Sequence, residues 1–236
     1  MGEFSLDKYN SLGAVLILLP YLDNDGYLKR KTVEGKPCLS RSDISGILKL
    51  GIKTFENVLK ELKACGLLIV EGARKSQIYK INTNYHSRGK LVHGTDTAVR
   101  IQNRGLKAMY EEGNVKLDAV GFFYLLIPYL SYDCCSLVRR VNFAGDNENA
   151  LSLAEICELL GMSNKTVQKY LGMKFNYKLK EGYYQIPVAI TSSAFDGSNK
   201  KIITLNPLLF RRNEKVTGEL TLASISVLFR NLSKKI

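Results

Sequence analysis

Residues 151–171 read LSLAEICELLGMSNKTVQKYL, and these residues carry the clearest indication of the fold. Ser152 can cap a helix at its N-terminus, and Glu155 three residues later completes a capping box. Gly161 can adopt the left-handed conformation that ends this helix, and Ser163 can cap the helix that follows. Two short helices joined by such a turn form a helix-turn-helix.

The same pattern occurs earlier in the chain, where residues 39–59 read LSRSDISGILKLGIKTFENVL. The pattern predicts a first helix that ends near Leu48 in this copy and near Leu160 in the later copy. Second helices are expected over residues 52–64 and 164–171. In the earlier copy Lys49 takes the position of the turn glycine and Gly51 that of the cap serine, so we expect a looser or shifted turn.

Two further blocks repeat in the same order. Residues 13–22, GAVLILLPYL, recur as residues 121–130, GFFYLLIPYL, and each block predicts a buried first helix with a proline near its end. Further on, YKIN at residues 79–82 matches ITLN at residues 203–206. The chain is therefore expected to hold two copies of one domain, over residues 1–90 and 113–213.

Each helix-turn-helix is followed by segments that predict a β-hairpin. In the first copy the expected strands are residues 67–70 and 77–82, joined by a turn with a basic tip. In the second copy they are residues 183–190 and 202–206, around a polar loop. A helix-turn-helix followed by a hairpin is a winged helix, so the predicted fold is α+β, mainly helical, with two tandem winged helix-turn-helix domains.

The remaining segments complete the predicted architecture. Residues 95–112 have helical character, and we expect a helical connector over residues 91–112. Residues 214–236 are expected to form a C-terminal helix with a broad apolar surface, which docks on the second domain or pairs with a second protomer.

Together these motifs resemble the winged-helix replication and copy-control proteins of plasmids and phages of Gram-positive bacteria. The resemblance rests on L-S-x-x-(D/E)-I-x-x-x-L followed by Lys-Thr, and on a hairpin that closes at Ile81-Asn82 or Leu205-Asn206-Pro207. It covers both copies. It implies binding to repeated sequences at a replication origin. The first copy departs from the family pattern by having Thr83 where the second copy has Pro207.

Charge supports a nucleic-acid partner, because 34 Lys and Arg against 22 Asp and Glu give the chain a formal charge of +12. Both copies are basic and the connector is neutral. In a winged helix the second helix enters the major groove, and the hairpin contacts the backbone or the minor groove. The residues that these roles predict for contact with double-stranded DNA are Arg41, Lys53, Thr54, Asn57, Lys60, Arg74, Lys75, Ser163, Asn164, Lys165, Gln168, Lys169, Lys200 and Lys201.

Other chemistry has little support in the sequence. Five cysteines with no C-x-x-C pair favour buried or incidental thiols over a disulfide framework, and the two histidines lack further metal ligands around them. No phosphate-binding glycine loop or nucleophile elbow occurs, so we expect no enzymatic activity, no cofactor and no metal. No apolar stretch is long enough to cross a bilayer and no signal peptide is recognisable, so the expected location is the cytoplasm.

Three functions remain open at this point. The first is initiation of plasmid or phage replication at origin repeats, with replication proteins as possible further partners. The second is transcriptional regulation, as a repressor at an operator, which would use the same chemistry. The third is a protein-interaction adaptor that has reused winged helices. An isolated Lys or Gln on a helix is usually only solvated, and DNA binding is favoured because both copies place such residues on the same helix face.

Overall fold

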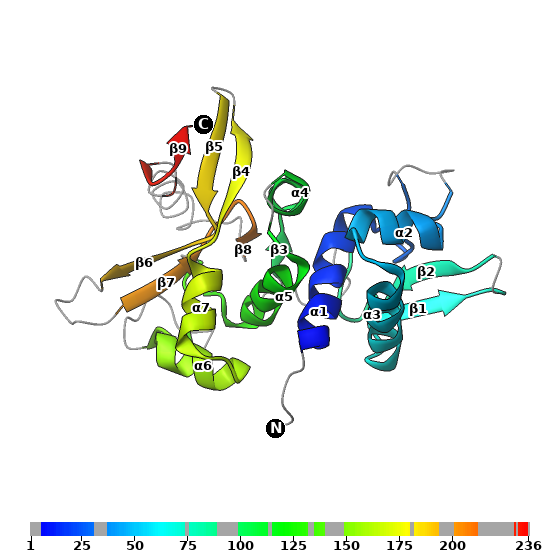
Figure 1. Ribbon diagram of the computed structural model, residues 1–236, viewed down its shortest axis with the longest axis horizontal. Coiled ribbons are helices and arrows are strands. Elements are labelled where there is room, and N and C mark those ends of the chain that lie inside the picture. Colours follow the sequence, from blue (N-terminus) through cyan, green and yellow to red (C-terminus); the bar gives the residue numbers. More distant parts are fainter. Residues whose placement is uncertain are drawn as a thin grey trace. The chain divides into compact units, whose positions relative to one another are not determined.

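The computed structural model describes residues 6–30, 37–73, 76–88, 99–112, 115–131, 135–139, 149–179, 182–193, 201–211, 229 and 231–235. The fold is α+β, with short helices and small antiparallel sheets (Figure 1). The chain divides into two compact units. The N-terminal unit comprises Ser5–Asp96 and Leu117–Tyr124, and the C-terminal unit comprises Met1–Phe4, Thr97–Lys116 and Leu125–Ile236.

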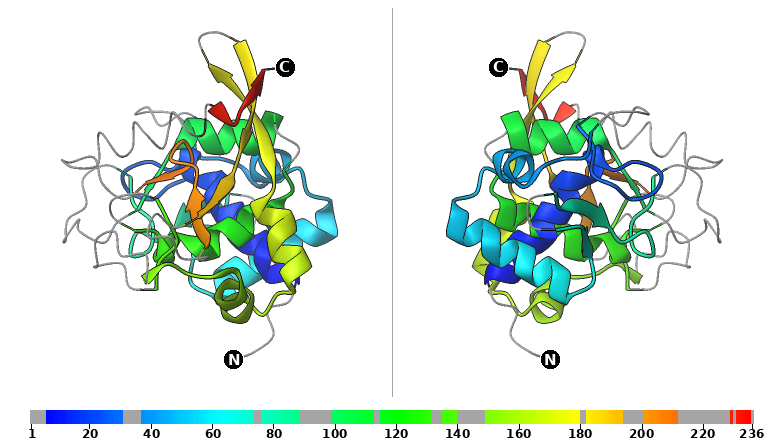
Figure 2. Two further views of the ribbon diagram at one scale, coloured as in Figure 1. Left: turned by 90° about the vertical axis from the view of Figure 1, so that its left-hand side faces the viewer. Right: turned by 90° about the vertical axis from the view of Figure 1, so that its right-hand side faces the viewer.

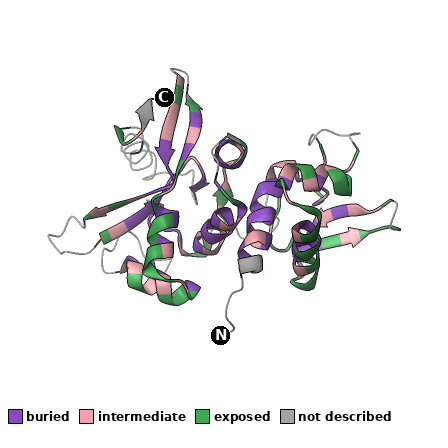
Figure 3. Cartoon of the chain, viewed as in Figure 1, coloured by how far each residue is buried: buried purple, intermediate pink, exposed green. Residues whose placement is uncertain are grey.

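The N-terminal unit packs helices against a small hairpin. Its elements are α1 (Leu6–Leu18), the 3-10 turn η1 (Leu19–Tyr21), α2 (Arg41–Leu48), α3 (Ile52–Ala64), β1 (Leu68–Glu71) and β2 (Ile78–Ile81). β1 and β2 are antiparallel, with Leu68 opposite Ile81. α1 packs against both α2 and α3, and its apolar side chains are buried (Figure 3). Burial of this apolar surface is the main stabilisation of the unit.

The first part of α5 (Leu117–Leu126) also belongs to the N-terminal unit, where it crosses α1 at two glycines. A Cβ atom added to Gly13 would lie 2.1 Å from the carbonyl oxygen of Leu117. One added to Gly121 would lie 1.8 Å from the carbonyl oxygen of Tyr9. Both distances are far inside van der Waals contact, so this crossing requires glycine at both positions. Gly13 and Gly121 occupy matching positions in the two repeated apolar blocks.

The C-terminal unit holds the second copy and additional strands. Its elements are β3 (Arg100–Ile101), α4 (Asn103–Lys107), the π-helical turn η3 (Ala108–Glu112), the end of α5, η4 (Ile127–Tyr129), α6 (Leu153–Leu160), α7 (Asn164–Leu171), β4 (Lys174–Leu179), β5 (Gly182–Pro187), β6 (Ala189–Ser193), β7 (Lys201–Leu205), β8 (Phe210–Arg211) and β9 (Lys234–Lys235). They form the small sheets β4-β5-β9, β6-β7 and β3-β8.

The sequence repeat is also a repeat of backbone pairing. In the first copy single bridges join Leu22 to Leu28, Tyr27 to Lys80 and Lys29 to Cys38. In the second copy the matching bridges join Leu130 to Leu137, Ser136 to Thr204 and Val138 to Ala150. The matching asparagines have matching roles as well. The side-chain amide of Asn82 donates to the carbonyl oxygen of Gly66 at 2.9 Å, and that of Asn206 to Pro187 at 2.8 Å.

The predicted second helices, over residues 52–64 and 164–171, are confirmed at both ends, and the preceding helices end at Leu48 and Leu160 as expected. The turn of the first copy is not shifted, contrary to expectation. Lys49 has φ 49° and ψ 37°, close to the φ 63° and ψ 31° of Gly161. Packing of the two helices therefore imposes the left-handed conformation even on a lysine, at a cost of about 1–2 kcal/mol.

The predicted strand over residues 183–190 is wrong. The structure divides this stretch between β5 and β6, and it is β6 that pairs with β7, with Ala189 opposite Leu205. β5 pairs instead with β4, a strand that the sequence analysis did not predict. The backbone N–H of Val188 donates to the carbonyl oxygen of Met173 at 2.9 Å. This bond closes the base of the β4–β5 hairpin, which is therefore an insertion before the hairpin that matches β1–β2.

Two further expectations are corrected in part. The connector is not helical throughout, because β3 pairs with β8 before α4 begins at Asn103. Most of the predicted C-terminal helix over residues 214–236 lies outside the described residues, which resume at residue 229. The end of that segment is not helical, since Lys234–Lys235 form β9 beside β5. The predicted domain boundaries at residues 90, 112 and 213 remain predictions.

Among the described residues, no helix is both long enough and apolar enough to cross a bilayer.

Candidate nucleic-acid interface

Each copy builds a pair of helices from local capping. In the first copy the Ser40 hydroxyl accepts from the backbone N–H of Asp43, and the Asp43 carboxylate accepts from the backbone N–H of Ser40 at 3.0 Å. In the second copy Ser152 and Glu155 form the same capping box, with the Ser152 N–H donating to Glu155 at 2.8 Å. The start of the helix that precedes α3 or α7 is therefore held by side chains within four residues of one another.

An arginine completes each capping box. Arg30 donates to the Asp43 carboxylate at 2.7 Å, and Arg139 donates to both carboxylate oxygens of Glu155. Hydrogen bonds from Ser40 and Arg30 lower the pKa of Asp43 to about 2. Hydrogen bonds from Arg139 and then Ser152 lower the pKa of Glu155 to about 2. Both carboxyl groups are thus ionised at neutral pH, which also suits the positive end of the helix dipole.

α3 buries one face and exposes the other. Phe55, Val58, Leu59 and Leu62 point into the N-terminal unit and are at most 5% exposed. The predicted contact residues Lys53, Asn57 and Lys60 are exposed, and Thr54 is half-buried. Since residues three and four apart in a helix lie on one face, the exposed side chains form a single polar surface along α3.

α7 has the same division. Val167, Tyr170 and Leu171 are buried, whereas the predicted contact residues Asn164, Lys165, Gln168 and Lys169 are exposed. Ser163 is exposed too, but its hydroxyl accepts from the backbone N–H of Thr166 at 3.2 Å, so its first role is to cap α7. The surface offers two ammonium groups and two amides, with no acidic residue within α7.

Arg41, a predicted DNA-contact residue, already has a partner within the protein. Its guanidinium forms an ion pair with the Glu56 carboxylate on α3 and lies 5.6 Å from the centre of the Phe55 ring. The second copy has Leu153 and Gln168 at the matching positions and therefore lacks this pair. Sequence analysis missed the pair because Arg41 and Glu56 come from different helices and meet only after folding.

A cavity of about 250 Å³ lies beside α3, between this helix and the β1–β2 hairpin. It is lined by Arg41, Glu56, Leu59, Lys60, Lys63, Val70, Gln77 and Tyr79. Three of these side chains are cationic. A fourth, Glu56, is acidic and pairs with Arg41, so the ammonium groups of Lys60 and Lys63 are the donors that a phosphate could contact here.

The structure describes only part of the two hairpin tips that were predicted to contact DNA. Arg74, Lys75 and Lys200 lie outside the described residues, so their predicted roles have no structural counterpart. Lys201 begins β7 and is exposed. The strand that carries it pairs with β6, which places Lys201 at the outer end of that hairpin.

The β4–β5 hairpin is a basic element that the predicted site did not include. Lys174 and Lys178 are exposed on β4, and Tyr183 is 45% exposed on β5. The alternation of polar and apolar residues in KFNYKL, residues 174–179, is the sequence signal that could have identified the strand.

Among the described residues, no group of three or more His, Cys, Asp or Glu side chains could hold a metal ion. Among the described histidine, lysine and arginine residues, only His86 has a pKa far from its ordinary value, and burial lowers that pKa to about 4. Its Nε2 lies 2.8 Å from the Tyr124 hydroxyl, an interaction within the N-terminal unit. We therefore assign His86 to packing and not to the polar surfaces of α3 and α7.

No family model matches this chain, and no curated protein or solved structure is significantly similar to it.

Proposed function

We propose that this protein binds double-stranded DNA in a sequence-specific manner through two winged helix-turn-helix domains. α3 and α7 would each enter a major groove, and the β1–β2 and β6–β7 hairpins would contact the backbone. The observation that carries the proposal is the match between the two copies. Each places a helix pair before a hairpin and presents a Lys at the second position of the exposed helix, Lys53 or Lys165.

The residue types on these faces suit DNA. Asn and Gln can donate to and accept from adenine in a bidentate manner, and Lys can reach guanine or phosphate. Asn164 and Gln168 lie one helical turn apart and are both exposed, so they can address neighbouring bases. Lys165 and Lys169 flank them and supply positive charge toward the phosphates.

We further propose that the DNA target is a set of repeats at a plasmid or phage replication origin, with replication proteins as possible partners. This part of the proposal is supported by the motif resemblance. The decisive experiment is recovery of bound DNA from a genomic pool with the full chain. Repeats next to a replication gene are expected. A lone operator upstream of a promoter would replace initiation by transcriptional regulation.

DNA binding itself is tested by salt. If both domains contribute about 6–10 phosphate contacts in total, the logarithm of the affinity should fall with the logarithm of salt concentration at a slope of about −5 to −9. A slope shallower than about −2 would exclude binding by two domains. Binding to a protein partner that is insensitive to salt, without DNA binding, would instead identify an interaction adaptor.

A further inference from the structure

The β4–β5 hairpin has no counterpart in the first copy. There α3 is followed by β1 after residues 65–67, whereas in the second copy residues 172–188 separate α7 from β6. The hairpin is fully paired, from Lys174 opposite Pro187 to Leu179 opposite Gly182. It projects beyond the helices of the C-terminal unit (Figure 2). A projecting element of this length, about 20 Å for six residues, can reach a ligand that α7 does not touch.

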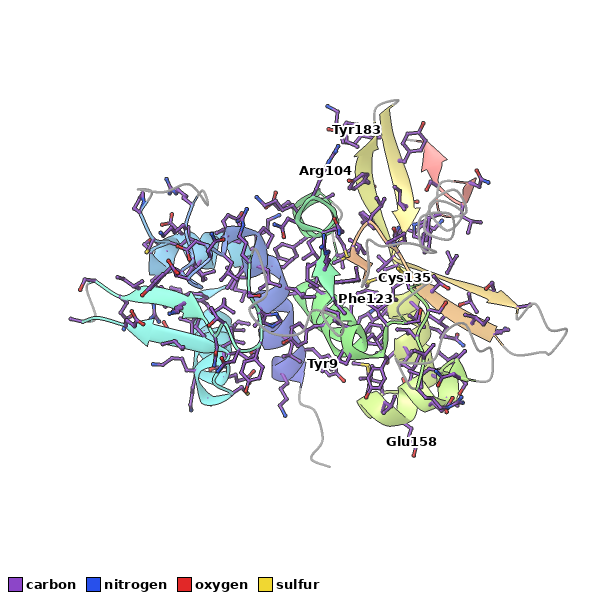
Figure 4. The ribbon with its side chains drawn as sticks, turned by 180° about the vertical axis from the view of Figure 1, so that it is seen from behind. Tyr9, Arg104, Phe123, Cys135, Glu158 and Tyr183 are labelled. Atoms are coloured by element: carbon purple, nitrogen blue, oxygen red, sulfur yellow. The ribbon has the colours of Figure 1, made fainter. Side chains whose placement is uncertain are left out.

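One face of the hairpin holds it to its own unit. Phe175, Tyr177 and Ile186 are at most 7% exposed, and β4 packs against η3. Arg104 of α4 donates to the carbonyl oxygen of Lys178 at 2.8 Å, and its guanidinium lies 5.2 Å from the centre of the Tyr177 ring. Figure 4 shows Arg104 and Tyr183 in this region. The hairpin is therefore anchored by contacts on its apolar face, which leaves the opposite face for another role.

The opposite face is basic and polar. Side chains alternate along a strand, so Lys174, Asn176 and Lys178 share this face with Tyr183 and Gln185 across the pairing. The Lys178 ammonium lies 5.6 Å from the centre of the Tyr183 ring, which holds the cation near the tip. On its other side β5 pairs with β9, with Lys234 opposite Gln185 in the register. Neither β4, β5 nor β9 contains an acidic residue.

The chemistry of this face suits phosphates better than a protein surface. Ammonium groups, side-chain amides and a tyrosine hydroxyl are the donors that position DNA by its backbone. Protein interfaces instead have a central apolar or aromatic cluster that becomes fully buried, and lysine is depleted there. Tyr183 is the single exposed aromatic residue that the described part of β4 and β5 offers. Lys174 and Lys178, about 13 Å apart along the strand, can reach separate phosphates.

We propose that the β4–β5 hairpin is an additional DNA-contacting element, which binds the phosphate backbone of duplex DNA outside the segment read by α7. This inference rests on the proposed function, because it assigns a further contact to the same DNA complex. It predicts that the second copy covers more DNA than the first copy does.

The test compares three forms of the full chain on a duplex that carries the recovered site. The first is the wild type, the second is Lys174→Gln with Lys178→Gln, and the third is Lys8→Gln with Lys116→Gln as a charge-matched control at exposed lysines elsewhere. Thermal unfolding at the same temperature in all three would show that folding is unchanged. The hairpin variant should bind about three- to thirty-fold more weakly at low salt, with a salt slope shallower by about 2. The control should change the slope by less than 0.5.

Footprinting then locates the contact. The hairpin variant should protect a shorter segment, truncated at one end, and on duplexes trimmed to that segment its affinity should equal that of the wild type. Unchanged slope and footprint in the hairpin variant would overturn the inference. Lys165→Ala with Gln168→Ala, which should weaken specific binding, is the positive control for the assay. A larger loss on single-stranded than on duplex DNA would also overturn it. Failure of the wild type to bind DNA would overturn the proposed function itself.

Discussion

α3 and α7 match position by position yet present different surfaces. Lys53 and Thr54 of α3 correspond to Lys165 and Thr166 of α7. The next exposed position is acidic in α3, Glu56, and an amide in α7, Gln168. Within the first copy, Glu56 is engaged by Arg41 from α2. The first copy therefore pairs a charge of each sign within its own surface, whereas the second copy has Leu153 and Gln168 at the matching positions and cannot form this ion pair.

The first exposed position of each helix also differs between the two copies, and again α7 has the residue that is better suited to hydrogen bonding with a base. Ile52 of α3 is 82% exposed, while its counterpart in α7 is the polar Asn164. An apolar side chain can contact the methyl group of thymine but cannot read a base by hydrogen bonds. This teaches that a shared backbone does not imply a shared role. We expect α7 to supply most of the base discrimination, and we expect the two half-sites to differ in sequence, as a direct or imperfect repeat.

The largest expected effect tests this asymmetry directly. Lys165→Ala with Gln168→Ala should cost about 2–5 kcal/mol of binding free energy on the specific site and less on random DNA. The matched change in α3, Lys53→Ala with Glu56→Ala, should cost less than about 1 kcal/mol, because it removes an acid together with a cation. Equilibrium titrations at one fixed salt concentration measure both. Equal losses of binding free energy for the two double variants would show that α3 and α7 contribute equally to recognition.

A second prediction compares the two capping boxes through pH. Glu155→Gln should destabilise the fold by about 1–2 kcal/mol at pH 7, since a bidentate arginine contact and a cap are lost. Because the pKa of Glu155 is lowered from 4.5 to about 2, the folded state favours the ionised form. The contribution is complete above about pH 4.5 and is lost as the pH falls toward 2.

Urea unfolding of wild type and variant between pH 7 and pH 2 measures this difference. Asp43→Asn should lose its destabilising effect in the same way as the pH falls from about 3.8 to about 2, because Asp43 holds the position that matches Glu155. Glu158→Gln, at an exposed residue of the same helix as Glu155, is the control. A difference between Glu155→Gln and wild type that stays constant over this pH range would contradict the assignment.

A third prediction converts one surface toward the other. Glu56→Gln gives α3 the residue of α7 and releases Arg41 from its ion pair. DNA affinity should rise about fivefold, or about 1 kcal/mol, because an acid that repels phosphate is removed. Adding Arg41→Leu, the residue type of Leu153, should cancel the gain. Asp25→Asn, at an exposed acid outside α2, α3 and the β1–β2 hairpin, serves as the control, and a comparable gain there would reduce the effect to net charge.

The smallest expected effect concerns the turns. Lys49→Gly should stabilise the protein by about 0.5–1 kcal/mol, because glycine adopts a φ of 49° without the steric cost that lysine has. Gly161→Lys should destabilise it by a similar amount. Thermal unfolding measures both changes, and the unfolding temperature should rise in Lys49→Gly and fall in Gly161→Lys. A loss of stability in Lys49→Gly would mean that interactions of the lysine side chain stabilise the fold by more than the backbone strain destabilises it.

The helices were predictable because their signals are local. A capping box joins residues three apart, and the turn between α6 and α7 needs only Gly161 and Ser163 in place. The exposure of the predicted contact residues on α3 and α7 followed from the same helices by their periodicity. The ion pair of Arg41 with Glu56 could not be predicted in this way, since no local sequence pattern around either residue indicates that the other will be its partner.

The hairpins show where local signals end. Residues 183–190 are continuous and suit a single strand, yet the chain changes sheet at Val188. That change depends on the bond from Val188 to Met173 and on the bond from the backbone N–H of Asn206 to Val188 at 2.9 Å. Both partners are distant in sequence. A strand has a periodicity of its own but no intrinsic partner.

The repeat, the helices with their caps and turns, and the basic character of the chain all follow from the amino-acid sequence, because each depends on residue type and on neighbours within a few positions. The pairing of the strands, the anchored β4–β5 insertion with its basic outer face, and the ion pair of Arg41 with Glu56 became visible only in the folded chain. These features arise from contacts between residues far apart in the sequence, and their geometry exists only once the core has packed.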